Sequence, residues 1–274
     1  RPGPPGARQG AKPRQELYTC GSYRILHMVR GAGLAVALAL VVAMLMWQTA
    51  VPGEQVDVVI SGGTVVTMDD QGTVIADGAV AIADGKIVAV GTADDIGARY
   101  AGADRVDASG QIILPGLINT HGHAPMVMYR GLADDMALMD WLNQYIFPAE
   151  KATVSPEFVR VGTQLAALEM IESGTTTFAD MYYFEEAIAH ATAEAGLRAV
   201  LGQTIIRFPV ADAATPEEGL ARAEAFLQQF ADDDLITPAV APHAPYTLTP
   251  ETLQAARALA NKYNAPLLIH LAET

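Results

Sequence analysis

Cysteine is almost absent from this sequence of 274 residues, which contains only Cys20. The chain therefore cannot form an internal disulfide, and it cannot bind a metal ion through a set of cysteines. Any metal ion must instead be held by histidine and carboxylate side chains. Cys20 lies in a leader rich in Pro, Gly and Arg, which supplies no electropositive pocket to activate a thiol, so we expect no reaction at it.

Positive charge is also scarce, because 17 Lys and Arg residues stand against 31 Asp and Glu, a net charge of −14. The deficit lies beyond the leader: from Glu54 onward there are 11 Lys and Arg against 30 Asp and Glu. Such an acidic surface repels polyanions, so we expect no nucleic-acid partner. The composition, 51% hydrophobic and 18% charged, is that of a globular chain with a large core rather than a disordered one.

Residues 1–53 are predicted to form a leader that carries a signal or membrane-anchor segment. Met28, the expected start of translation, and Arg30 precede an uncharged apolar segment over residues 31–50. As a cleaved export signal this segment has a poor cleavage site, Gln48-Thr49-Ala50. As an uncleaved anchor it is marginal, because about 20 apolar residues are needed to span a bilayer.

A buried core helix is a third interpretation of the same apolar segment. We favour export or membrane anchoring, because Arg30 and Pro52 bracket the segment and no polar residues alternate within it. The basic flank then predicts that the folded part lies on the periplasmic side. Without a genuine leader, the protein would be cytoplasmic.

Residues 54–114 have the pattern of a small antiparallel β unit, the N-terminal portion of a β-sandwich. Asp84-Gly85 is a strong hairpin signal, because both residues tolerate the positive φ of a tight turn. Strands are predicted over residues 56–60, 64–68, 79–83 and 86–90.

From residue 115 to 274, apolar strands alternate with amphipathic helices, which indicates βα units around a parallel sheet. Strands are predicted over residues 112–119, 175–180, 199–206, 237–241 and 266–270. Helices are predicted over residues 137–146, 156–173, 185–195, 216–230 and 250–264. Ser155 and Thr249 each precede a Pro-Glu pair and suit helix N-caps, and Gly174 and Gly196 suit helix exits.

Five βα units without a Gly-x-Gly-x-x-Gly motif after the first strand favour an α/β fold of the TIM-barrel type, (β/α)8, over a dinucleotide-binding fold. Since five strands do not close a barrel, we expect the barrel to be incomplete and the chain to be a fragment.

The strongest chemical signal is His121-Gly122-His123 at the end of an apolar strand. Residues two apart on an extended chain project to the same side, so both imidazoles can bind one metal ion. In a barrel, the carboxyl ends of the strands carry the catalytic groups. The alternative is a pair of solvent-exposed loop histidines.

A second strand ends in His270, followed by Glu273. His270 is predicted to be a third metal ligand, and Glu273 is close enough to handle protons of a water on the metal. The alternative for His270 is a hydrogen-bonded core histidine.

Two further residues are candidates for substrate contact. His243 follows the fourth strand and can hydrogen-bond a substrate ring or a developing charge as a neutral imidazole; the alternative is a structural histidine held by its flanking prolines. Glu150 could accept hydrogen bonds from a diol, although on the sequence alone it is an ordinary surface residue. Asp180 ends the second strand and is a weaker candidate for a supporting role.

Residues 56–274 resemble the amidohydrolase superfamily, and within it the branch of 5-methylthioadenosine/S-adenosylhomocysteine deaminases and chlorohydrolases. The motifs that carry the resemblance are Val59-Ile60-Ser61-Gly62-Gly63, Pro115-Gly116-Leu117-Ile118-Asn119-Thr120-His121-Gly122-His123, Glu172-Ser173-Gly174-Thr175-Thr176-Thr177, Pro242-His243-Ala244-Pro245-Tyr246 and His270-Leu271-Ala272-Glu273-Thr274.

The resemblance implies a zinc-dependent barrel in which His121, His123 and His270 are metal ligands. It implies substrate contacts from Glu150, His243 and Glu273, with His243 and Glu273 catalytic. In such enzymes a metal-bound hydroxide attacks the amine-bearing ring carbon and ammonia leaves. The family also uses a later histidine and a metal-binding aspartate, and this sequence contains neither region.

We therefore expect one divalent metal ion, Zn²⁺, and a small aminopurine or similar heterocycle as the substrate. Hydrolysis of a triazine chloride or amine, and deamination of a free base, are alternative reactions. An inactive truncated chain, or a binding protein without catalysis, is the alternative of another class. The sequence leaves open whether the protein forms a homo-oligomer.

Overall fold

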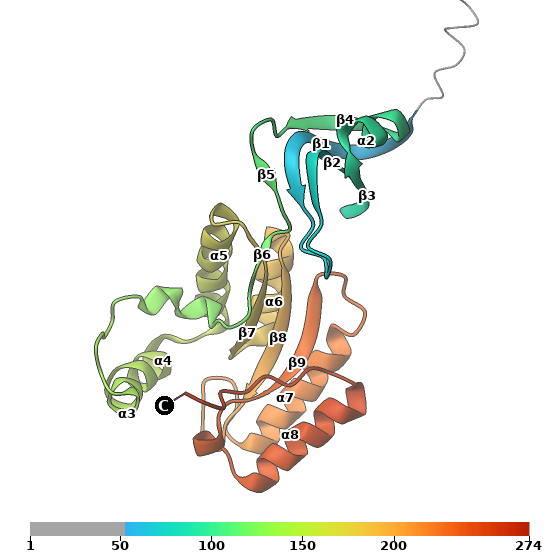
Figure 1. Cartoon of the computed structure of the whole chain (residues 1–274). Coiled ribbons are helices and arrows are strands. Elements are labelled where there is room, and N and C mark those ends of the chain that lie inside the picture. The colour runs from blue at the N-terminus through green and yellow to red at the C-terminus, as the bar shows by residue number, and fades with distance from the viewer. Residues whose placement is uncertain (1–52, 274) are drawn as a thin grey trace, which may run out of the picture. The chain divides into compact units, whose positions relative to one another are not determined.

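The computed structural model describes residues 53–273, which divide at Ile113/Leu114 into two compact units (Figure 1). The predicted signal or anchor segment at residues 31–50 lies outside the described residues. Within residues 53–273, no helix is both long and apolar enough to cross a membrane.

The first unit is one mixed sheet with a short helix against it. Strand order is β3-β2-β1-β4, and β5 also pairs with β1. Its elements are β1 (Glu54–Val66), β2 (Val74–Ala83), β3 (Lys86–Thr92), α2 (Ala93–Arg99), β4 (Tyr100–Asp107) and β5 (Ile112–Ile113). The hairpin predicted at Asp84-Gly85 joins β2 to β3, with φ of 50° and 69° at its two residues.

Two predictions for this unit were wrong, and two of its elements were not predicted. The segment predicted over residues 56–60 and the first three residues of that predicted over 64–68 belong to one strand, β1, because Gly62 at φ 88° and two shifts of register let the strand pass through Ser61-Gly62-Gly63. The sheet is not wholly antiparallel, since β4 and β5 both pair parallel with β1. Helix α2 and strand β4 were not predicted; Thr92 caps α2 by accepting a hydrogen bond from the Asp95 N–H.

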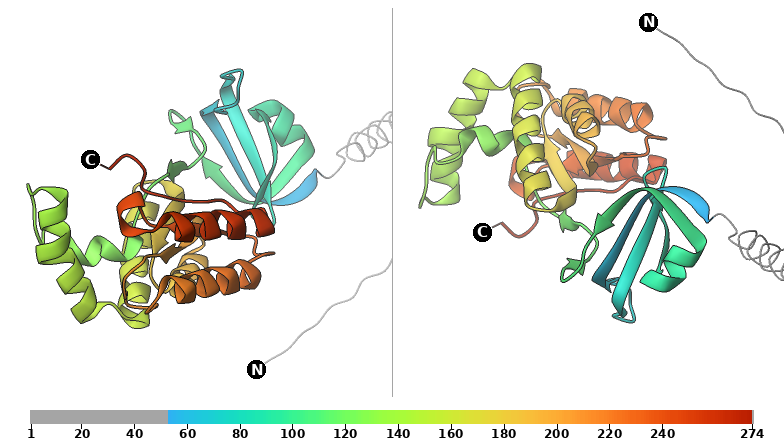
Figure 2. Two further views of the ribbon diagram at one scale, coloured as in Figure 1. Left: turned by 90° about the horizontal axis from the view of Figure 1, so that it is seen from below. Right: turned by 90° about the horizontal axis from the view of Figure 1, so that it is seen from above.

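The second unit is a parallel sheet in the order β6-β7-β8-β9, formed by β6 (Leu117–Asn119), β7 (Thr175–Tyr182), β8 (Arg198–Ile205) and β9 (Ile236–Pro242). Helices α5 (Pro156–Glu172), α6 (Glu185–Ala195), α7 (Pro216–Gln229) and α8 (Pro250–Tyr263) alternate with the strands, and α7 and α8 lie side by side (Figure 2). This repeated parallel βα order confirms the α/β, barrel-type fold class.

Local signals set most of the helix ends. Ser155, Thr215 and Thr249 each accept a hydrogen bond from the N–H three residues later, and each is followed by a proline at the first helical position. Gly174 and Gly196 follow α5 and α6 with φ of 80° and 74°, a conformation that glycine adopts without strain.

The predicted strands at 112–119 and 266–270 form only in part. Pro115-Gly116 separates β5 from β6, since proline has no N–H to donate to a ladder. In the segment after α8, Leu267 forms a single parallel bridge with Val240. This bridge still places the segment beside β9, as a fifth parallel strand requires.

A long excursion connects β6 to α5. It contains η1 (Ala124–Tyr129), α3 (Leu138–Trp141), the π-helical segment η2 (Leu142–Ile146) and α4 (Phe147–Thr153). The single helix predicted over residues 137–146 is therefore wrong in type, because its second half is a π-helix, a form that recurs at functional sites.

Helix α5 approaches η1 closely at Gly162, and this contact supports the segment after His123. A Cβ on Gly162 would lie 2.7 Å from the Pro125 carbonyl oxygen and 2.8 Å from its Cα. We expect Gly162→Ala to lower the free energy of unfolding by about 1–3 kcal/mol, because the clashing atoms are backbone. The control is Gly219→Ala in α7, whose nearest atom would be 3.5 Å away. Urea denaturation that finds both variants equally stable would contradict this prediction.

Acidic side chains are buried near the carboxyl end of β7. Glu185 is fully buried; its Oε1 accepts a hydrogen bond from the Tyr182 N–H at 2.6 Å, and its Oε2 has no partner among the described residues. Burial raises the pKa of Glu185 well above its usual range, and Asp180, Asp212 and Glu186 raise it further.

A carboxyl group with a raised folded-state pKa contributes stability below its unfolded pKa and loses it as pH rises towards the folded value. We therefore expect Glu185→Gln, which keeps the acceptor for the Tyr182 N–H, to become more stable than the wild type as pH rises above about 5. Denaturant midpoints at pH 5, 7 and 9 measure this. Parallel curves for the two proteins would show that Glu185 carries no such shift.

Candidate metal centre and adjoining pocket

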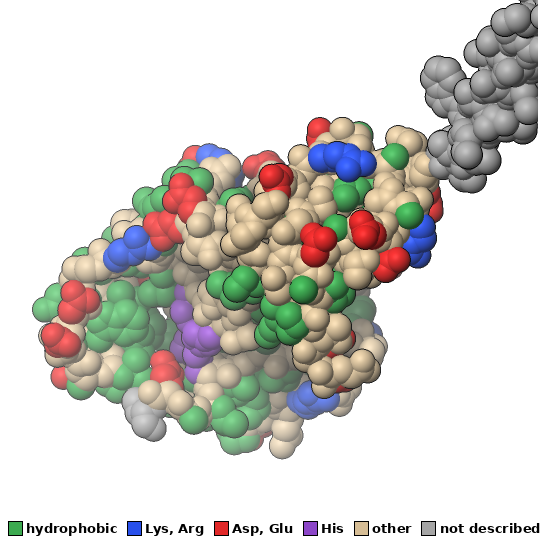
Figure 3. Space-filling model, turned by 45° about the horizontal axis from the view of Figure 1, so that its top comes forward, with side chains coloured by type: hydrophobic (Ala, Val, Ile, Leu, Met, Phe, Trp, Pro, Cys, Tyr) green, Lys and Arg blue, Asp and Glu red, His purple; other side chains and the backbone are tan. Residues whose placement is uncertain are grey.

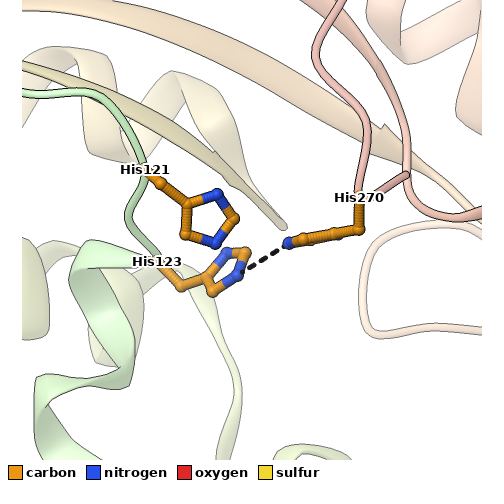
Figure 4. A group of neighbouring side chains, drawn as sticks. All are labelled: His121, His123 and His270. Atoms are coloured by element: carbon orange, nitrogen blue, oxygen red, sulfur yellow. Dashed lines mark hydrogen bonds between the residues drawn. The ribbon is translucent and has the colours of Figure 1, made fainter. Parts of the chain in front are cut away.

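The structure brings three histidines together from two distant parts of the chain (Figure 4). His121 and His123 lie just beyond β6, and His270 lies beyond the Leu267 bridge. One nitrogen of each ring lies within 4.8 Å of the others. The Nε2 atoms of His123 and His270 are 3.2 Å apart.

Backbone carbonyls orient two of these rings. The Nδ1 atom of His123 lies 2.8 Å from the Met181 oxygen, and that of His270 lies 2.9 Å from the His243 oxygen. A carbonyl oxygen can only accept, so each Nδ1 donates and each Nε2 of a neutral ring presents a lone pair. Burial lowers the pKa of His123 to about 4, which favours this neutral form.

Two facing lone pairs repel each other unless a cation lies between them. Zinc–nitrogen bonds of about 2.0–2.1 Å at a tetrahedral angle separate two ligand nitrogens by about 3.4 Å, close to the 3.2 Å between the Nε2 atoms. Carbonyl groups that hold the distal ring nitrogens are also typical around metal-bound histidines. The three residues thus fit a divalent metal ion.

The loop that carries His121 and His123 is held at both ends. The Asn119 side-chain oxygen accepts a hydrogen bond from the His121 N–H at 3.2 Å. The carboxylate of Asp180, fully buried at the end of β7, accepts one from the Ala124 N–H. Asp180, a weak candidate on sequence, thus supports the loop, and its signal was a lone carboxylate in an apolar strand.

The remaining predicted site residues line the same cavity as His123 and His270. The histidines are visible at the floor of a recess (purple in Figure 3). The polar residues of the lining include Glu150, Tyr182, Tyr183, Thr204, His243 and Glu273, and the apolar ones include Met126, Trp141, Leu142, Ile146, Phe147 and Met181. Polar groups that converge in a cavity together with apolar and aromatic side chains are typical of small-molecule sites.

Glu273 and His243 lie on one side of this cavity. The Tyr246 hydroxyl donates a hydrogen bond to Glu273 Oε2 at 2.7 Å. His243 Nδ1 is 3.0 Å from the Thr247 hydroxyl, and its ring centroid is 4.9 Å from that of His270. Burial lowers the pKa of His243 to about 3, so its imidazole is neutral.

Glu150, in α4, lines the same cavity and is only 8% exposed. The surface position expected from sequence alone is therefore wrong. The Tyr182 hydroxyl donates to Glu150 Oε1 at 2.8 Å, and the Tyr183 hydroxyl approaches Oε2 at 3.5 Å. Burial raises the pKa of Glu150 to about 7, and the two hydroxyls oppose that rise. Neither tyrosine was predicted from the sequence to be part of the site.

Both units of the chain have matches among known protein families. The Amidohydrolase family model matches residues 112–274, and a bacterial imidazolonepropionase-like composite domain matches residues 78–103. A 5-methylthioadenosine/S-adenosylhomocysteine deaminase of Syntrophus aciditrophicus is 50% identical over 80% of this chain and 50% of its own length. One from Thermodesulfovibrio yellowstonii is 47% identical over 76% of this chain and 48% of its own length.

Solved structures give the same result. An adenosine deaminase of Xanthomonas campestris with bound zinc has a TM-score of 0.79 and 42% identity over 81% of this chain and 51% of its own. An Arthrobacter triazine hydrolase, at 23% identity and a TM-score of 0.70 over 79% of this chain and 53% of its own, shares the fold. The chain spans about half the length of the curated relatives it matches. Because the family model matches residues 112–274, which is more than half of the chain and includes all of the second unit, this chain belongs to the amidohydrolase family.

Proposed function

We propose that the protein is a metal-dependent hydrolase that deaminates an aminopurine nucleoside of the 5-methylthioadenosine or S-adenosylhomocysteine kind. Water replaces the ring amino group, so that an oxopurine and ammonia are the products. The observation that carries the proposal is the buried Glu150 carboxylate, which lines one cavity with His123 and His270. The printed names of the relatives support the same substrate class.

His121, His123 and His270 would hold the metal ion, for which zinc is our choice because imidazole is among its preferred ligands. When bound, the ion supplies Lewis acidity and lowers the pKa of a coordinated water to about 7. The carbonyls of Met181 and His243 keep two of the imidazoles in the required tautomer.

Proton transfer is assigned to Glu273. Its carboxylate can take a proton from the attacking water and return it to the purine ring, so that the amino group leaves as ammonia. The bond from Tyr246 orients the carboxylate. Neutral His243 supplies a hydrogen bond to the ring, which stabilises the charge that develops on it.

Substrate orientation is assigned to Glu150 and the apolar wall. The two oxygens of Glu150 can accept hydrogen bonds from the two hydroxyls of a ribose, while Trp141 and Phe147 offer aromatic surface to the base. A triazine or a free base has no diol, and for such substrates Glu150 would have no partner.

The test uses the zinc-loaded full-length protein and compares ammonia release from 5-methylthioadenosine and adenine with chloride release from a chlorotriazine. We expect the nucleoside to have the highest kcat/KM, and Glu150→Gln to lower that value about 10- to 100-fold, the effect of a hydrogen bond to a charged group. Glu157→Gln, at an exposed glutamate paired with Arg160 on α5, is the control. A preference for adenine or the triazine, or indifference to Glu150→Gln, would contradict the proposal.

A further inference from the structure

Two adjacent tyrosines approach the same carboxylate. Tyr182 and Tyr183 are 4% and 5% exposed, and their hydroxyls lie 2.8 Å and 3.5 Å from the two oxygens of Glu150. Adjacent residues of a strand point to opposite faces. Here Tyr183 lies one residue beyond β7, and the two rings pack with their centroids 4.8 Å apart.

Buried acceptors fix the backbone on both sides of this pair. The Tyr182 N–H donates to Glu185 Oε1 at 2.6 Å. The next residue, Phe184, has a left-handed backbone with φ 55° and donates its N–H to Asp212 Oδ2 at 2.8 Å. Asp212 Oδ2 also accepts a bond from Gln203 at 2.8 Å and lies 3.3 Å from Nε of Arg222.

The hydroxyls leave part of Glu150 free for a ligand. An ionised carboxylate offers about four lone-pair positions, of which the two tyrosines use one on each oxygen. One position on each oxygen then remains for the cavity. Two donors on neighbouring carbons, as in a vicinal diol, match such an acceptor, whereas a single hydroxyl engages only half of it.

We propose that Tyr182 and Tyr183 are positioning residues that hold Glu150 as a two-point acceptor, and that they thereby set a preference for ribonucleosides over 2′-deoxyribonucleosides. This inference rests on the proposed deaminase function and adds the residues that control its sugar specificity. Because the Tyr182 hydroxyl is closer to Glu150 than the Tyr183 hydroxyl is, Tyr182 contributes more to this sugar preference.

The experiment measures kcat/KM of the full-length, zinc-loaded protein for adenosine and 2′-deoxyadenosine. We expect Tyr182→Phe to lower the ratio of the two values about tenfold, through a higher KM for adenosine with little change for 2′-deoxyadenosine. Tyr183→Phe, which removes the longer contact, should lower the ratio less. The control is Tyr263→Phe. Tyr263, at the end of α8, donates a hydrogen bond to Glu224 of α7 at 2.7 Å and does not line the cavity, so this substitution should leave the ratio unchanged.

Equal losses on both nucleosides in Tyr182→Phe and Tyr183→Phe would show a merely structural role and overturn the inference, as would an unchanged ratio. Metal content and circular dichroism identify a variant that has not folded. If one tyrosine variant does not fold, the ratio measured for the variant of the other tyrosine tests the inference. If the wild type releases no ammonia from 5-methylthioadenosine or from either of these nucleosides, the proposed function fails and the inference with it. An active wild type with an unaffected ratio refutes the inference alone.

Discussion

Replacing His270 with alanine is expected to lower kcat/KM for nucleoside deamination about 10³-fold. The variant loses one of three clustered imidazoles, and with it a Lewis acid that stabilises the transition state by several kcal/mol, about 4 kcal/mol for this fold-change. The measurement is ammonia release together with zinc content by elemental analysis. Activity and zinc content should fall together.

The matched control is His190→Ala. His190 lies on α6 with its ring 5.7 Å from that of Phe230, outside the cavity lining, and its replacement should leave both quantities unchanged. Full zinc content and full activity in the His270 variant would contradict its assignment as a ligand.

Glu273→Gln is expected to lower kcat about 10²- to 10⁴-fold, the usual contribution of a general acid–base group. Glutamine keeps the size of the side chain and can still accept the hydrogen bond from Tyr246, but it cannot take up a proton. KM and zinc content should therefore change little. Steady-state kinetics of deamination provide the measurement.

Glu251→Gln supplies the control, since Glu251 is an exposed acid in the first turn of α8. A Glu273 variant with normal kcat and a raised KM would mean that Glu273 binds the substrate without transferring a proton.

Signals within a few residues of one another predicted much of the second unit. The Ser-Pro-Glu and Thr-Pro-Glu starts place α5 and α8 within one residue at each end, and Glu185–Ala195 is predicted without error. The starts of α5 and α8 depend on side-chain caps and the ends of α5 and α6 on glycine exits, and these signals involve only neighbouring residues. The barrel-type fold class follows from the alternation of such strands and helices.

Features that depend on distant pairing were not predictable. Strand β4 contains Gly102 and three charged residues among its eight, and its place beside β1 comes from parallel pairing across more than 40 residues. Glu150 has the sequence surroundings of a surface residue, and only the packing of α4 against Tyr182 and Tyr183 buries it. No pattern near residue 150 contains that information.

The histidine cluster lies between these cases. Each motif is local: His121-Gly122-His123 follows one strand, and His270 lies in a later segment. The contact between His123 and His270, however, joins residues that are 147 positions apart in the sequence. The principle that the carboxyl ends of parallel strands share one edge connects the two. Asp180, Tyr182 and Tyr183 follow from the same principle, because all three come from the end of β7 or the residue after it.

The central claim is that these three histidines hold one divalent metal ion. The most direct measurement is a crystal structure of the zinc-loaded full-length protein with anomalous data collected at the zinc edge. We predict one strong peak bonded to nitrogens of His121, His123 and His270, at about 2.0–2.1 Å from each. No peak at this cluster, or zinc bound only elsewhere on the protein, would contradict the account.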